Sequence, residues 1–216
     1  MSDQEGRWVH QVGHHFDSAE QELSANKLGF WLFLATEVLL FGGLFVAYAV
    51  FRNLYPEMFL DAHRHLDRTM GAINTVVLIC SSFTMVMAVR AAQTGKRSQQ
   101  VMFLVITFSL AAVFLVVKYF EYSAKFSHGL LPGPWYSPGP GDPVNGNLFF
   151  GLYFMMTGLH GVHVVAGMVA MVWVLIKALK GRFSSSWYTP IELVGLYWHL
   201  VDLIWIFLFP LFYLIG

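Results

Sequence analysis

Five long apolar stretches constrain this chain more than any other feature. A bilayer core about 30 Å thick needs about 20 apolar residues in helical conformation, and five segments meet that length. Only 12% of the 216 residues are charged and 56% are hydrophobic, whereas a soluble domain carries about 25% charged residues. We therefore expect an all-α integral membrane bundle of five transmembrane helices. The predicted spans are roughly 28–52, 70–92, 100–122, 149–177 and 191–215.

The segments between and before these spans are short, with one exception. Residues 1–27 are polar and mixed in charge, without the basic and apolar regions of a cleavable signal peptide. Residues 123–148 hold five of the eight prolines and predict a structured outer loop. We interpret the chain as a polar cytoplasmic tail, 1–27, followed by one five-helix transmembrane domain, 28–216.

The distribution of Lys and Arg predicts the orientation, because short cytoplasmic loops carry an excess of them. The tail and the loops after the second and fourth spans hold eight of the 13, and the opposite side holds five. The N-terminus is therefore expected in the cytoplasm and the C-terminus outside. The 13 basic and 13 acidic residues cancel, which gives no indication of a nucleic-acid partner.

Ionisable side chains inside the spans are the candidate functional residues. A charged side chain at mid-membrane costs about 2.5–3.5 kcal/mol on insertion scales, so each should face protein or water. At 1.5 Å per residue, three of them lie about 12 to 17 Å from the cytoplasmic side and are expected to share one layer: Glu37, His199 and Asp202. The other candidates are Glu121, His160 and His163.

Local spacing predicts further relationships among these residues. Lys118 precedes Glu121 by three residues, so the two can pair on one helix face. His160 and His163 share a face for the same reason. For each candidate a structural hydrogen bond between helices is the plainest interpretation. Proton transfer, contact with lipid headgroups and haem ligation are the alternatives, but His163 and His199 differ in depth by about 9 Å, which disfavours a bis-histidine haem.

No residue is predicted to be catalytic or to bind a metal or redox cofactor. The single cysteine, Cys80, excludes an internal disulfide and any site that needs two thiolates from this chain. No glycine-rich fingerprint indicates a nucleotide site. The isolated chain is therefore expected to be non-catalytic.

Four motifs in order along the spans resemble subunit III of the haem-copper oxidases, in its bacterial five-helix cytochrome c oxidase form. They are "TEVLLFGGLFVAY", "FEY", "TGLHGVHVVAG" and "YWHLVDLIWIFLF", and the resemblance runs from about Lys27 to the C-terminus. It implies an accessory subunit of a proton-pumping terminal oxidase in aerobic respiration, in the bacterial inner membrane. Subunit I is implied as the direct partner, with subunits II and IV in the complex and cytochrome c as electron donor. The resemblance places haem and copper in the partner subunits and implies bound phospholipid.

The same resemblance assigns roles residue by residue. Glu37 matches the buried, carbodiimide-reactive carboxylate of the family's "SEV" motif, with Thr36 in place of Ser. The family role is to support proton uptake by subunit I and to protect it from inactivation during turnover. The remaining matches are Glu121 and Tyr122 with "EY", His160 and His163 with "HGLH", and Trp198, His199, Asp202 and Trp205 with "WHFVDVVW".

Several alternatives stay open at this point. Subunit III of a quinol oxidase and a homologue associated with nitric oxide reductase have similar spans. Quinol oxidases are expected to carry Asp where Glu37 stands and Phe where Tyr197 stands, so these two residues favour a cytochrome c oxidase. In other classes of protein, the chain would be a di-haem cytochrome or a proton transporter using Glu37 and His199. The absence of inverted repeats argues against the transporter.

Overall fold

The computed structural model describes residues 13–14, 16–140, 142–143, 145–185 and 187–214. Its long elements are α1 (Ala19–Leu54), α3 (Arg68–Gln93), α4 (Arg97–Ser127), α5 (Asn147–Leu179) and α6 (Thr189–Phe209). All five are long and apolar enough to cross a membrane, the last one counted through Leu214. The predicted all-α bundle of five membrane-spanning helices is confirmed.

Short helical turns complete the connections. The link between α1 and α3 contains α2 (Pro56–Ala62) and the 3-10 turn η1 (His63–His65), and the predicted outer loop contains the 3-10 turn η2 (Gly133–Trp135). Because Pro210 lacks an N–H, it cannot continue the α-helical hydrogen-bond ladder, and α6 passes there into the π-helical turn η3 (Pro210–Leu214).

Side-chain caps fix where the helices begin. The Ser18 hydroxyl accepts a hydrogen bond from the Gln21 amide at 3.1 Å, and Glu20 and Glu22 in the first turn interact favourably with the helix dipole. As a result α1 begins at Ala19, earlier than the predicted span. Residues 1–12 and 15 of the predicted tail lie outside the described residues, and the division into tail and domain stays a prediction.

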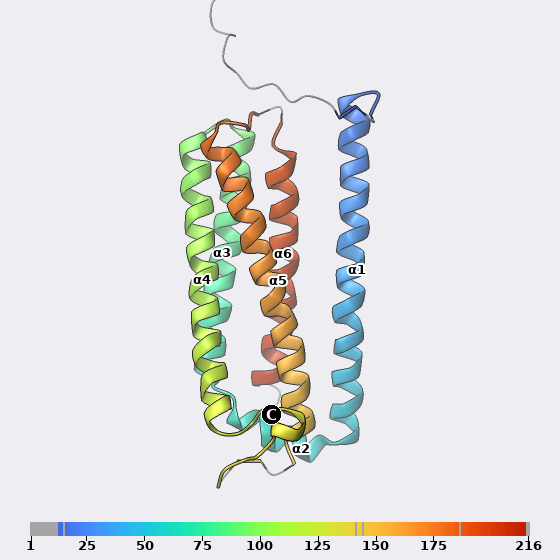
Figure 1. Cartoon of the computed structure of the whole chain (residues 1–216), viewed down its shortest axis with the longest axis vertical. Coiled ribbons are helices and arrows are strands. Elements are labelled where there is room, and N and C mark those ends of the chain that lie inside the picture. The colour runs from blue at the N-terminus through green and yellow to red at the C-terminus, as the bar shows by residue number, and fades with distance from the viewer. Residues whose placement is uncertain (1–12, 15, 141, 144, 186, 215–216) are drawn as a thin grey trace, which may run out of the picture.

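Helix α1 stands apart from a group formed by the other four long helices (Figure 1). Within that group α3 packs along α4 and α6, and α5 packs against α4 and α6. The buried residues of α1 are Leu34, Phe41 and Tyr48, each two turns from the next. A single narrow stripe therefore attaches α1 to the bundle. The largest buried side chains of the core include Trp198 and Trp205 on α6.

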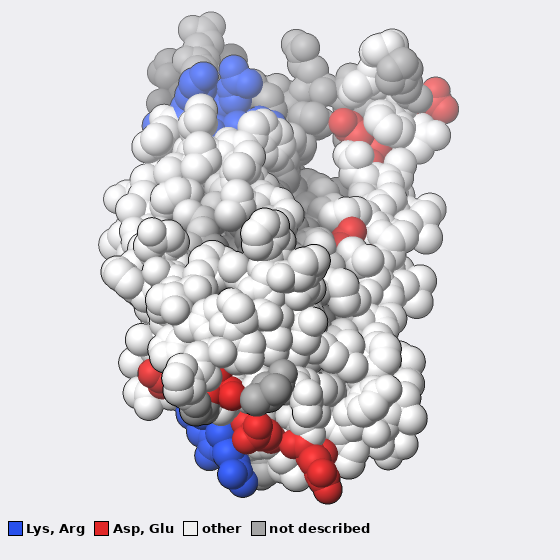
Figure 2. Space-filling model, turned by 60° about the horizontal axis from the view of Figure 1, so that its bottom comes forward, with Lys and Arg blue, Asp and Glu red and all other residues white. Residues whose placement is uncertain are grey.

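The two ends of the bundle differ from its middle. The beginning of α1 and the end of η3 lie at opposite ends of the molecule (Figure 1), as an odd number of spans requires. Charged side chains gather at both ends, with an almost uncharged face between them (Figure 2). Which end faces the cytoplasm stays a prediction from the Lys and Arg distribution.

Candidate functional site

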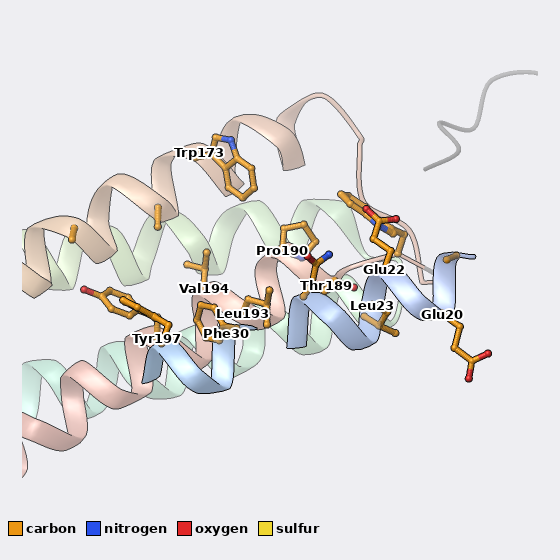
Figure 3. A pocket seen from close by; sticks show the side chains of 16 residues that line it. Glu20, Glu22, Leu23, Phe30, Trp173, Thr189, Pro190, Leu193, Val194 and Tyr197 are labelled. Carbon is orange, nitrogen blue, oxygen red and sulfur yellow. The ribbon is translucent and has the colours of Figure 1, made fainter. Parts of the chain in front are cut away.

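A cleft of about 750 Å³ separates the first half of α1 from α5 and α6. Trp173 on α5, Phe30 on α1 and Val194 on α6 line it from three sides (Figure 3). Its mouth is polar, and an ion pair at 3.7 Å joins Lys27 on α1 to Glu192 on α6 at the same end of the bundle. The cleft is therefore an apolar space with a charged rim.

Glu37 forms a close pair with His163. Glu37 Oε2 lies 2.8 Å from His163 Nε2, and His163 Nδ1 lies 2.8 Å from the Leu159 carbonyl oxygen. A carbonyl oxygen can only accept, so Nδ1 carries a hydrogen. One further proton is then shared between Glu37 and His163 Nε2, either as an ion pair or as a neutral carboxyl donating to imidazole.

Tyr197 connects this pair to the cleft. Its side chain lines the cleft (Figure 3), and its hydroxyl donates to the His163 carbonyl oxygen at 3.2 Å. Its ring stacks on Phe33 at 6.0 Å and on the His163 ring at 6.4 Å between centroids. The side chains of Glu37 and His163 are 15% and 14% exposed, so the rest of this chain does not fully enclose the pair.

His199 and Asp202 have surroundings different from those of Glu37. His199 Nδ1 lies 2.7 Å from the Ser82 hydroxyl of α3. Asp202 is buried, and within the described residues neither of its carboxylate oxygens has a hydrogen-bond partner. Glu37 and His199 bond to different helices: Glu37 to His163 on α5, and His199 to Ser82 on α3. The expected common depth of Glu37, His199 and Asp202 stays a prediction.

His160 and His163 lie on one side of α5, but their side chains form hydrogen bonds with different helices. The His160 Nε2 atom donates to the Val201 carbonyl oxygen of α6 at 3.1 Å. Its ring packs against Phe114 and Trp205, with centroids 5.5 and 5.3 Å away, and it is fully buried. This geometry matches a hydrogen bond that fixes helix packing.

Lys118 and Glu121 form the predicted pair, at 2.9 Å. The Lys118 ammonium also donates to the hydroxyls of Tyr153 at 3.0 Å and Tyr213 at 3.2 Å. The Tyr213 hydroxyl in turn donates to the other Glu121 oxygen at 2.6 Å. The Trp205 ring lies 5.1 Å below the ammonium, within the range of a cation–π interaction. Two tyrosines from other helices thus complete a buried ionic cluster.

Sequence reasoning missed Ser82, Tyr153 and Tyr213. Their partners are far away along the chain, and no spacing rule links them. Among the described residues, no group of three His, Cys, Asp or Glu side chains is placed to hold a metal ion.

A model of the family described as "Cytochrome c oxidase subunit III" matches residues 7–216. The chain belongs to the cytochrome c oxidase subunit III family. It is 28% identical to the cytochrome bo(3) ubiquinol oxidase subunit 3 of Pseudomonas aeruginosa, over 96% of this chain and 93% of that protein. It is 30% identical to the cytochrome c oxidase subunit 3 of Thermostichus vulcanus, over 92% of each. It is 31% identical to a probable quinol oxidase subunit 3 of Staphylococcus epidermidis, over 93% of this chain and 94% of that protein.

These matches confirm the resemblance read from the four motifs. The similar proteins are subunit III chains of multisubunit haem-copper oxidases, and the chain is a multi-pass membrane protein by its five spans. The relatives include subunits of both cytochrome c oxidases and quinol oxidases.

Proposed function

We propose that this chain is the accessory subunit III of a bacterial cytochrome c oxidase and that it supports proton uptake by subunit I. In this proposal subunit I is the direct partner, subunits II and IV belong to the same inner-membrane complex, and the partner subunits hold the haem and copper. Cytochrome c then supplies the electrons. Glu37 and Tyr197 stand where Asp and Phe are expected in quinol oxidases, which supports the cytochrome c donor.

The observation that carries the proton role is the Glu37–His163 pair, which Tyr197 links to the cleft. Its two members share one proton across 2.8 Å, and both remain partly exposed. Taking up a second proton gives a neutral carboxyl beside an imidazolium, and releasing one gives a carboxylate beside a neutral imidazole. The pair therefore suits exchange of protons with water that enters from the end of the bundle where α1 begins.

The cleft suits a phospholipid. Its lining is mostly aromatic and aliphatic and would take an acyl chain, and a cation lies near its mouth. The Lys177 ammonium lies 3.6 Å from the centroid of the Trp173 ring, which lines the cleft, and it can contact a lipid phosphate. A bound lipid would keep α1 at its distance from α5 and α6.

The test compares Glu37→Gln and Glu37→Ala in the complete oxidase, purified through a tag on this chain. Gln keeps a hydrogen bond to His163 but carries no exchangeable acidic proton, so it separates the proton role from packing. We expect unchanged haem content in both variants and faster loss of activity during turnover in both. The exposed residue Leu39 on α1 provides the control Leu39→Ala.

Each outcome bears on a different part of the proposal. If Glu37→Gln turns over as long as the wild type, the pair has only a structural role. Recovery of the wild-type chain without any haem-containing partner refutes the subunit assignment. Oxidation of quinol but not of reduced cytochrome c by the purified complex would instead make it a quinol oxidase subunit.

A separate variant tests the lipid. Ala170→Trp fills the cleft and should lower the phospholipid retained per haem.

A further inference from the structure

The outward face of α3 and α6 presents a polar pair among exposed apolar side chains. On α6, His199 lies in one stripe with Leu203 and Ile206, which are 50% and 44% exposed. On α3, Ser82 lies between Ile79 and Val86, one turn away on either side. We call this surface, made of Ile79, Ser82, Val86, His199, Leu203 and Ile206, the α3–α6 face.

The polar pair lies near the middle of the membrane. His199 is about 15 Å along the helix from Thr189, where α6 begins, and Ser82 is about 16 Å from Gln93, where α3 ends. The hydrocarbon core is about 30 Å thick. Both side chains therefore lie at the depth of acyl chains and far from either headgroup layer.

One ring nitrogen of His199, Nε2, lacks a hydrogen-bond partner at this depth within the described residues. Nδ1 is engaged by the Ser82 hydroxyl at 2.7 Å, and the half-buried ring has no protein partner for Nε2 among the described residues. One helical turn further along α6, both carboxylate oxygens of Asp202 are buried without a hydrogen-bond partner within the same residues. Acyl chains can neither donate nor accept a hydrogen bond, and an unsatisfied polar group in hydrocarbon costs several kcal/mol.

The outward faces of α4 and α5 differ in this respect. They expose apolar side chains such as Val116 and Val162. The exposed Ser109 on α4 satisfies itself by donating to the Val105 carbonyl oxygen at 2.9 Å. Lipid can cover those surfaces without leaving a polar group unpaired.

We propose that the α3–α6 face is the docking surface for a transmembrane helix of a partner oxidase subunit, and that this helix carries a hydrogen-bonding side chain level with His199. The inference rests on the proposed function, because it requires a complex. It assigns the "WHLVD" segment of α6 to subunit association: its imidazole offers Nε2 to the partner, while Ser82 fixes the ring orientation through Nδ1.

Site-specific photocrosslinking in native membranes tests the surface. The photoreactive amino acid p-benzoylphenylalanine replaces Leu203 on the α3–α6 face or, as the matched control, Val116 on α4. We expect Leu203 to give adducts with another oxidase subunit and Val116 to give lipid adducts only. Adducts from Leu203 with lipid only, or with a second copy of this chain, would overturn the proposal.

A second experiment tests the hydrogen bond itself. His199→Leu should weaken retention of haem on the tagged complex about 3- to 18-fold under increasing detergent, as expected from the loss of one interhelical hydrogen bond in a membrane. His199→Gln should retain more haem than His199→Leu, because its amide can still donate and accept. Equal haem retention by wild type and His199→Leu would show that His199 makes no contact with a partner.

The two proposals fail in different ways. Absence of haem from the wild-type preparation refutes the proposed function. Recovery of haem together with lipid-only adducts from Leu203 refutes the docking surface alone.

Discussion

Removing one charge from the buried Lys118–Glu121 pair should destabilise the protein strongly, and removing both should cost much less. The two side chains are 9% and 1% exposed, so water cannot solvate a charge left behind. Breaking a buried ion pair by deleting one partner costs about 3–5 kcal/mol. We expect a loss of that size for Lys118→Met, which removes the ammonium that donates to the Glu121 carboxylate at 2.9 Å, and for Glu121→Gln.

The double variant Lys118→Met with Glu121→Gln removes both charges of this pair, so neither is left buried without the other. It should therefore be more stable than either single variant, with a coupling energy of about 2 kcal/mol or more, at the upper end of the range measured for residues in contact. The assay is reversible unfolding of the purified protein in mixed micelles, followed by tryptophan fluorescence. The exposed Lys96 provides the control Lys96→Met, which should change the free energy of unfolding by less than about 0.5 kcal/mol.

Two results would refute this reasoning. A cost below about 1 kcal/mol for Lys118→Met would mean that the cluster is solvated or that the carboxyl is neutral without the lysine. Additive effects in the double variant would mean that the two side chains do not interact energetically.

Two further predictions follow from close contacts. A Cβ on Gly167 would lie 2.8 Å from the ring of the buried Trp198, so Gly167→Ala should cost about 1–3 kcal/mol in the same unfolding assay. A Cβ on Gly161 would meet no atom within 4 Å, so the control Gly161→Ala should be neutral or stabilising by up to about 1 kcal/mol. Equal effects of the two substitutions would contradict the close packing at Gly167. In the outer loop the Tyr136 hydroxyl donates to the Pro143 carbonyl oxygen and accepts from the Gly146 amide, and burial raises its pKa above the ordinary 10.0. The neutral phenol is thus favoured in the folded loop, so its stabilisation is present below pH 10 and is lost as pH rises through the raised pKa. Tyr136→Phe should melt earlier than the wild type at neutral pH, and this difference should shrink above pH 10.0; a difference that stays constant with pH would show that the phenol does not titrate against folding.

The amino-acid sequence by itself determined the features that are local along the chain. Five spans follow from hydropathy, because each helix satisfies its own backbone hydrogen bonds in lipid. The Lys118–Glu121 pair follows from the spacing of residues on a single helix face, which needs no knowledge of other helices. The four ordered motifs were enough to identify the family.

Only the tertiary structure decided which buried polar groups meet. Rise per residue gives the depth of Glu37, His163 and His199 along their helices, but it gives neither the rotation of each helix about its axis nor the identity of its neighbours. Those depend on packing of whole faces, which placed α1 beside α5 and directed Glu37 to His163, 126 residues away. The same packing brought Tyr213 to Glu121, 92 residues away, and left His199 on an outward face at mid-membrane, because a helix can bury only the sides that its neighbours cover.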